Sequence, residues 1–224
     1  MNPTIIKNGS KLSTLEEFKA AIAEERRQDR RHAKAFVAAC VSGDRLSFDR
    51  AISMLHDWSI DGWRIAIRAI ARHAPAVSED IKRAFLAEWI ETKSIQRSVG
   101  DDKATLSALR VLLPAYTGPP MRLFRGDNLV NRRRRTYGIA WSAKRATAER
   151  FAQEPYNLAS KGGAVLLKTL APASSIICAT HVIGDHYGED EYLVDRRVLG
   201  PVEIVARYPQ IFPEELSQFR HEPG

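Results

Sequence analysis

A chain of 224 residues can bury one large core or two small ones, and its 44% hydrophobic and 27% charged residues are ordinary values for a globular protein. No apolar run approaches the roughly 20 residues that span a bilayer, which excludes a membrane-spanning segment. The first residues lack the basic and apolar regions of a signal peptide, so we expect a cytoplasmic protein; delivery into another cell without a cleaved signal stays open. The net charge of +7 suits an anionic partner.

The first half of the chain has a helical pattern almost throughout. Ser13 or Thr14 can cap a first helix, which continues to about Cys40. Further helices are expected at 45–57, 61–74, 78–98 and 102–113. Each is amphipathic and must bury one face. The pattern predicts a helical domain over residues 1–117, whose role the sequence does not indicate.

After Pro120 the period changes to short extended segments separated by Gly, Pro, Asn and Asp. The expected strands are 121–125, 164–170, 175–179, 191–194 and 202–208, with one helix at about 145–153. Strands with a single early helix favour an α+β domain over alternating βαβ units. We therefore predict the α+β class, with an all-helical N-terminal domain followed by a mixed α/β domain over residues 118–224.

Leu123-Phe124-Arg125-Gly126 places an arginine at the expected end of a short apolar strand. The guanidinium group of Arg125 offers a planar set of donors that suits a phosphate or a carboxylate. Gly126 lets a ligand approach the backbone, because no Cβ stands in the way. The alternative is an arginine at a strand end that makes a surface ion pair.

The segment from Tyr137 to Ala143 contains Trp141-Ser142, and a helix is expected behind it. A strand that ends in a serine and is followed by a helix can present a hydroxyl group to a ligand. The alternative makes Ser142 a helix N-cap and Trp141 part of the core.

Gly188-Glu189-Asp190-Glu191 places two glutamates at i and i+2, on one side of an extended segment. Successive acids repel one another, so the run costs stability unless the acids are solvated in an exposed turn. The functional alternative is a carboxylate pair: one member stabilises developing positive charge, and the other accepts a proton from an incoming nucleophile.

In order and spacing, these three elements resemble the arginine–serine–glutamate branch of the ADP-ribosyltransferase superfamily, the cholera-toxin-like and clostridial-toxin-like group. That group has an arginine that closes its first strand, an aromatic-Ser/Thr segment that runs into a helix, and a Glu-x-Glu turn. The resemblance covers about residues 120–208. Many members have Ser-Thr-Ser where this chain has Trp141-Ser142-Ala143. The resemblance implies a split β-sheet domain that transfers a single ADP-ribose from NAD.

The resemblance also implies how NAD would be held. Arg125 would bind the pyrophosphate or the ribose, and the backbone of Gly126 would bind the nicotinamide amide. Tyr137 or Trp141 would pack on a ring. Ser142 would position both the nicotinamide ribose and the catalytic glutamate.

The glycosidic bond to nicotinamide would then break through an oxocarbenium-like transition state. By the same resemblance, the ionised Glu191 would bind the ribose 2′-hydroxyl and stabilise the cation, and Glu189 would orient or deprotonate the acceptor. A glutamate at this first position goes with arginine acceptors in the family. We therefore expect catalytic roles for Glu191, Glu189, Arg125 and Ser142, and a target protein that offers an arginine side chain.

Two alternatives to protein modification stay open. The same fold could use water or nucleic acid as the acceptor, and Arg132-Arg133-Arg134-Arg135, expected in a loop, could bind nucleic acid. A different class of function is a basic nucleic-acid-binding or adaptor protein with a degenerate cleft. Cys178, His181 and His186 fit no zinc spacing, and we expect no metal. The sequence does not distinguish a toxin or effector from a housekeeping modifier.

Overall fold

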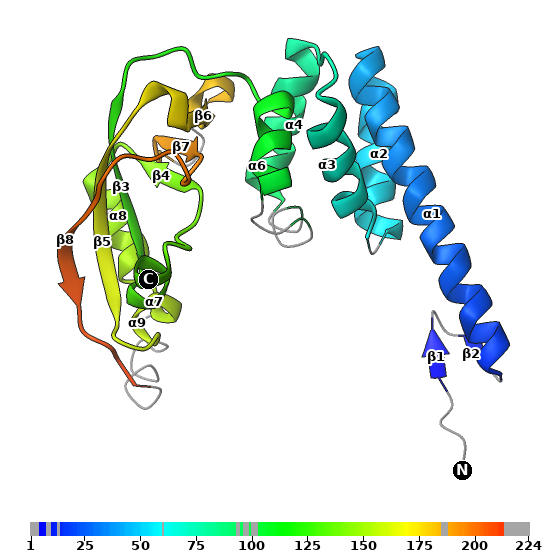
Figure 1. Cartoon of the computed structure of the whole chain (residues 1–224), viewed down its shortest axis with the longest axis horizontal. Coiled ribbons are helices and arrows are strands. Elements are labelled where there is room, and N and C mark those ends of the chain that lie inside the picture. The colour runs from blue at the N-terminus through cyan, green and yellow to red at the C-terminus, as the bar shows by residue number, and fades with distance from the viewer. Residues whose placement is uncertain are drawn as a thin grey trace. The chain divides into compact units, whose positions relative to one another are not determined.

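The computed structural model describes residues 14–57, 59, 61–92, 95, 99, 103–184 and 188–212, and only the backbone of residues 5–7, 10–12 and 58. The chain divides into two compact units, Met1–Leu112 and Leu113–Gly224, which we name the helical unit and the sheet unit. Each is described by itself (Figure 1). Helices dominate the first, and a six-stranded sheet with helices forms the second, so the predicted α+β class is confirmed.

The helical unit begins with a two-stranded antiparallel hairpin and continues with helices. Its elements are β1 (Ile5–Lys7), β2 (Ser10–Leu12), α1 (Leu15–Ser42), α2 (Arg45–Trp58), α3 (Gly62–His73), α4 (Glu79–Glu91) and α6 (Lys103–Leu112). A capping box starts α1: the Thr14 hydroxyl accepts from the Glu17 N–H, and the Glu17 carboxylate accepts from the Thr14 N–H. Gly43, with φ of 72°, ends the helix in the left-handed conformation that glycine adopts readily.

An aromatic cluster forms part of the core of the helical unit. The ring of Phe36 on α1 lies 5.7 Å from that of Phe48 on α2, 5.3 Å from that of Trp63 on α3 and 6.1 Å from that of Phe85 on α4, between centroids. All four residues are buried. Rings at these separations bring large apolar areas from four helices together, so this cluster holds the helices against one another.

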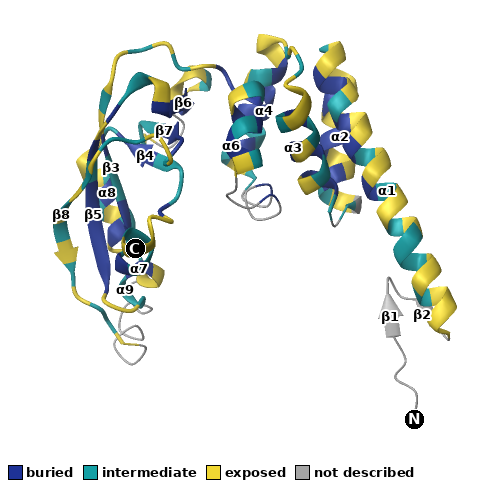
Figure 2. Cartoon of the chain, viewed as in Figure 1, coloured by how far each residue is buried: buried dark blue, intermediate teal, exposed yellow. Residues whose placement is uncertain are grey.

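The sheet unit is built on one antiparallel sheet with the strand order β6-β7-β4-β3-β5-β8. The strands are β3 (Met121–Asn128), β4 (Ala140–Ser142), β5 (Ala164–Ala171), β6 (Ile176–Ala179), β7 (Glu191–Val194) and β8 (Val202–Tyr208). Buried residues run along most of β5 and through β6 and β7 (Figure 2). The sheet therefore carries the core of this unit, with Leu123, Trp141, Leu167 and Tyr192 among its members.

Short helices accompany the sheet: α7 (Leu129–Arg134), α8 (Arg145–Ala152), α9 (Pro155–Leu158), and the 3-10 turns η1 (Ala173–Ser175) and η2 (Thr180–Ile183). Helix α8 packs closely on β3 at Gly126. A Cβ atom at this position would overlap the backbone of Ala148 and Ala152, so only glycine permits the packing.

Three sequence expectations need correction. Helix α4 ends at Glu91, where the Thr92 N–H caps the Glu88 carbonyl, instead of continuing to 98; most of residues 93–98 lie outside the described part. The strand expected at 121–125 continues to Asn128, because Gly126 is needed for packing and not for a turn. The arginine run expected in a loop lies in helix α7, with Arg135 as its left-handed C-cap.

Within the described residues, no helix is long and apolar enough to cross a membrane. Cys40 and Cys178 are buried free thiols, one in each unit. Burial raises the pKa of each thiol to about 12, which makes both poor nucleophiles at neutral pH.

Candidate functional site

Three strands that are far apart in the sequence lie side by side in the sheet unit. β3 pairs with β4 through Phe124 and Ser142, and β4 pairs with β7 through Ser142 and Glu191. Ser142 thus has Phe124 opposite it on one side and Glu191 on the other. Because Arg125 follows Phe124, the arginine, serine and glutamate elements all meet where these three strands are neighbours.

Arg125 is held in place by its own strand and by β4. Its Nε donates to Asp127 Oδ2 at 2.8 Å, and its Nη1 donates to the Ala140 carbonyl at 2.5 Å. A Cβ at Gly138 would stand 2.6 Å from Nη2, so a side chain there would push the guanidinium away. The arginine side chain keeps about a fifth of its surface exposed. Among the described contacts, Nη2 is the end of the guanidinium that remains for a ligand.

The partner of Arg125 is a buried carboxylate that sequence reasoning missed. Asp127 is 2% exposed and also accepts from the Asn128 N–H, the Asn131 side chain and the Gly138 N–H. A buried charge is stable only when it is paired and fully hydrogen-bonded, as this one is. Its place two residues after Arg125, on the same side of β3, was the signal in the sequence.

The missing Cβ of Gly126 serves the packing of a helix. The position where its Cβ would be faces the backbone of helix α8, as described above, and not an open cleft. The structure shows that Gly126 brings α8 close to β3.

The residues Gly188-Glu189-Asp190-Glu191, which we name the acidic turn, are tied to the end of β4. The Ser142 hydroxyl donates to the Glu189 carbonyl at 2.6 Å and accepts from the Lys144 N–H at 2.9 Å. Lys144 Nζ donates to the Gly188 carbonyl at 2.8 Å. The Ala143 N–H donates to the Asp190 carbonyl at 3.1 Å. Ser142 is therefore a tether of the acidic turn and not a helix N-cap, since Lys144 caps α8.

The acidic turn is not the extended segment that the sequence suggested. Gly188 has φ of 63° and Asp190 has φ of 45°, both in the left-handed region. Asp is one of the few residues that tolerate this region. Because the backbone is left-handed at these two residues, it is the turn, and not strand alternation, that positions Glu189 relative to Glu191.

Glu191 is the first residue of β7 and carries the most perturbed carboxyl group of the site. The residue as a whole is half-buried, but its carboxyl group is largely shielded from water. This burial disfavours the charged form and is the main cause that raises the pKa of Glu191 to about 7. The negative charge of Glu189 also raises this pKa, and the positive charge of Arg125 lowers it. No direct ion pair joins Arg125 to Glu191 among the described contacts. Their link is electrostatic, since the charges of Glu189 and Arg125 both act on the Glu191 carboxyl.

Glu189 is engaged by a second arginine. Arg150, on α8, donates from Nη2 to Glu189 Oε1 at 2.8 Å. The arginine side chain is 61% exposed and that of Glu189 24%. The two residues are 39 positions apart in the chain, so no local pattern in the sequence pointed to this pair.

Tyr137 and Trp141 were expected to pack on a ring of the ligand, and the structure assigns them to the core instead. They are 5% and 1% exposed, their rings are 5.7 Å apart, and the Trp141 indole donates to the Gly138 carbonyl. A ring buried to this extent has no free face for a ligand.

The arginine run of α7 is divided between two environments. Arg132 donates to the Val202 carbonyl of β8, whereas Arg133, Arg134 and Arg135 are exposed. The structure therefore leaves three arginines of this run exposed to solvent.

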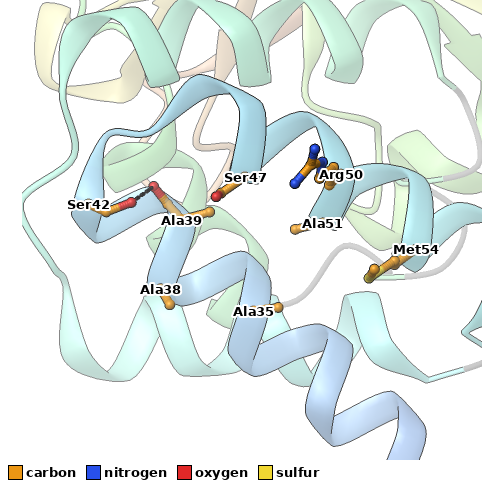
Figure 3. A pocket seen from close by; sticks show the side chains of 8 residues that line it. All are labelled: Ala35, Ala38, Ala39, Ser42, Ser47, Arg50, Ala51 and Met54. Carbon is orange, nitrogen blue, oxygen red and sulfur yellow. Dashed lines mark hydrogen bonds between the residues drawn. The ribbon is translucent and has the colours of Figure 1, made fainter.

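The helical unit has pockets of its own. One, between α1 and α2, has a volume of about 330 Å³ (Figure 3). It is lined mostly by small side chains: Ala35, Ala38, Ala39, Ser42, Ser47, Arg50, Ala51 and Met54. We assign no chemistry to it, because the Ser42 hydroxyl is bonded to the Ala39 carbonyl and the alanines offer only methyl groups.

Another pocket, between α1 and α3, has a volume of about 210 Å³ and is rich in charge. Its lining consists of Arg26, Asp29, Arg30, Asp61, Arg64, Ile65 and Arg68. The buried Asp29 accepts from the Asp61 N–H, which ties the start of α3 to α1; the Asp61 side chain itself does not cap the helix. Four exposed guanidinium groups therefore surround one concave surface.

The described residues contain no cluster of three His, Cys, Asp or Glu side chains that could hold a metal, and His186 lies outside them. Comparison with protein-family models, with curated proteins and with solved structures finds no match for this chain.

Proposed function

We propose that the sheet unit is a mono-ADP-ribosyltransferase, which moves ADP-ribose from NAD to a protein arginine and releases nicotinamide. The observation that carries the proposal is the register of β3, β4 and β7. It brings the arginine, serine and glutamate elements onto neighbouring strands, with Ser142 directly opposite Glu191. The family resemblance requires these elements to be together, although they are separated by up to 66 positions in the sequence (Arg125 to Glu191).

The charges of the site suit the cleavage of a glycosidic bond. A carboxyl group with a pKa of about 7 is partly ionised at neutral pH, so Glu191 can accept a hydrogen bond from the ribose 2′-hydroxyl and stabilise a developing cation. Arg125, fixed by Asp127 and Ala140, presents Nη2 as a donor for a phosphate or ribose oxygen.

Ser142 supports this chemistry indirectly. Its hydroxyl is already occupied by the acidic turn and by the Lys144 N–H, so it positions the turn and, through strand pairing, Glu191. The Thr180 hydroxyl donates to the Glu191 carbonyl from the other side at 3.0 Å. The backbone that carries Glu191 is therefore fixed by β4 and by Thr180, so little of its freedom has to be lost when substrate binds.

The acceptor is tested by supplying NAD together with a mixture of protein and DNA and identifying the products by mass spectrometry. ADP-ribose on arginine side chains supports the proposal. ADP-ribose on DNA, or free ADP-ribose alone, would instead assign a nucleic-acid or water acceptor to the same site. Glu189→Gln should reduce transfer more than NAD hydrolysis, because Glu189 acts on the acceptor.

A second candidate function is favoured by the arginine-lined pocket of the helical unit. Arg26, Arg30 and Arg68 make no ion pair with the described residues, and Asp61 engages Arg64. On each of the two helices the arginines are four residues apart, which is about 6 Å along the helix axis. This spacing suits a row of phosphates. On this alternative the protein is a nucleic-acid binder without NAD chemistry.

Calorimetry separates the two functions. Tight, salt-sensitive DNA binding that weakens in Arg30→Gln and Arg68→Gln, together with no binding of NAD, would favour the second function. Arg72→Gln, an exposed arginine of α3 outside the pocket lining, is the matched control. NAD binding that survives these substitutions would favour the first.

A further inference from the structure

The acidic turn holds an arginine of its own chain. Arg150 Nη2 lies 2.8 Å from Glu189 Oε1, so a guanidinium already occupies the carboxylate to which the proposed function assigns the acceptor. An arginine acceptor from another protein would have to bring the same chemical group to the same carboxylate. The intramolecular pair is therefore in the place of a substrate.

Both partners of this pair are anchored by their backbones. Arg150 belongs to α8, which packs on β3 at Gly126, and the acidic turn is tied to β4 by Ser142, Ala143 and Lys144. The arginine side chain is 61% exposed, so its guanidinium is accessible from solvent and able to turn toward a bound ligand. A group that is both anchored and accessible has a high effective concentration at the site.

The neighbouring carboxylate belongs to the same electrostatic site. Glu189 raises the pKa of the Glu191 carboxyl, which requires the two acidic groups to lie close together. The guanidinium on Glu189 is thus near the carboxylate that the proposed function places beside the ribose.

We propose that Arg150 is an acceptor in its own right and that the protein ADP-ribosylates this residue within the same chain. The inference rests on the proposed function and names one specific substrate for it. Once modified, Arg150 would carry a bulky, anionic group beside Glu189, and the acidic turn would be closed to other acceptors.

The step balances without any further reactant. The bond between the ribose C1′ and the nicotinamide nitrogen breaks, and its electron pair leaves with nicotinamide, which becomes neutral. A bond forms between C1′ and an Nη atom of Arg150. The proton lost by this nitrogen passes to Glu189 and then to solvent, so the products are ADP-ribosyl-arginine, nicotinamide and a proton.

The test uses the full-length protein, NAD and two arginines of one helix. Arg145, also on α8, pairs with Glu149 at 2.9 Å and is 58% exposed, so it matches Arg150 in exposure and pairing, but its carboxylate partner belongs to its own helix and not to the acidic turn. After incubation with NAD, proteolysis and mass spectrometry locate ADP-ribose. We expect it on Arg150 and only background on Arg145, and R150K but not R145K should abolish it.

Dilution shows whether the reaction occurs within one chain. The fraction of protein modified per unit time should be independent of protein concentration, as for a unimolecular step. A rate that rises in proportion to protein concentration would overturn modification in the same chain.

Free arginine amide is supplied as a second acceptor, so that the two proposals fail differently. Transfer to arginine amide with no ADP-ribose on Arg150 would overturn this inference and leave the proposed function in place. Absence of transfer to both acceptors, with no nicotinamide released, would overturn both. Equal modification of Arg150 and Arg145 would also overturn the inference, because it would show only that exposed arginines react.

Discussion

An ion pair of the helical unit and one of the sheet unit lie in contrasting environments, although the sheet unit also carries exposed pairs. In the helical unit the pair Arg45–Asp49 joins side chains that are 61% and 49% exposed, and Arg64–Asp61 is similar. In the sheet unit the Asp127 side chain, which pairs with Arg125, is only 3% exposed. The first kind of pair joins residues about one helical turn apart on an exposed surface, whereas the second joins two residues of one strand inside the fold.

The difference matters because a buried charge costs more stability than an exposed one. Exposed pairs contribute little and cost little, because water solvates both charges. Buried charges must be fully hydrogen-bonded, and clusters of charges with perturbed pKa values are concentrated at functional sites. This criterion supports the proposal that the functional region is the neighbourhood of β3, β4 and β7.

The largest stability effect is expected from Asp127→Ala. It leaves Arg125 without its carboxylate and three further donors without an acceptor, so unfolding should become easier by about 3–5 kcal/mol. Asp49→Ala, the matched change in the helical unit, should cost less than about 1 kcal/mol. Urea unfolding of both variants measures the difference. Equal losses would mean that the two environments do not differ as described.

Glu191→Gln should have a pH-dependent effect of the opposite sign. The folded-state pKa of about 7 lies above the ordinary 4.5, so the wild type loses stability as pH rises from about 4.5 to 7. Above pH 7 the wild type has lost roughly 3 kcal/mol of its free energy of unfolding, and the variant with glutamine, which does not ionise, avoids this loss. Thermal or urea unfolding from pH 4 to 8 tests this.

The control for this change is Glu203→Gln, which removes an exposed carboxylate paired with Lys168. It should alter stability by less than about 1 kcal/mol. A pH profile of Glu191→Gln that runs parallel to the wild type between pH 4.5 and 7 would be inconsistent with the raised pKa.

Ser142→Ala should have a smaller effect, because it removes two hydrogen bonds without burying a charge. We expect a loss of about 1–3 kcal/mol and faster hydrogen exchange at the Ala143 amide, which bonds to the acidic turn. Ser160→Ala removes an exposed hydroxyl bonded to the Tyr156 carbonyl and serves as the control. Unchanged exchange at Ala143 would show that Ser142 does not hold the turn.

The smallest effect is expected for the exposed pair Arg64–Asp61. A double-mutant cycle with Arg64→Gln and Asp61→Asn should give a coupling of about 0.2–1 kcal/mol, reduced by salt. A coupling above about 2 kcal/mol would place this pair with the buried pairs of the sheet unit.

Local signals in the sequence were enough for the start of α1 and for the change from helices to strands. Thr14 and Glu17 lie three residues apart, so the capping box is visible without a structure. The acidic run 189–191 and the arginine before Gly126 are likewise local features. These patterns involve neighbouring residues, which is why they could be predicted.

What could not be predicted depends on contacts between distant segments. Gly126-Asp127-Asn128 has the composition of a turn, yet Gly126 is fixed by α8 and Asp127 by Arg125, so the strand continues. Trp141 was expected to contact a ligand. Its burial depends on pairing with β7 and on the core, which are contacts with distant segments that the local sequence does not show. The pair of Arg150 with Glu189 was not predicted, because the two residues are 39 positions apart in the sequence.

Release of nicotinamide from NAD tests the central claim most directly. It is measured by chromatography for the wild type, Glu191→Gln and Glu203→Gln at equal concentration. We expect release by the wild type and by Glu203→Gln, and a loss of roughly 10²–10³-fold in Glu191→Gln, as when a group that stabilises transition-state charge is removed. Release by Glu191→Gln at the wild-type rate, or no release by the folded wild type, would contradict the assignment of this site to NAD cleavage.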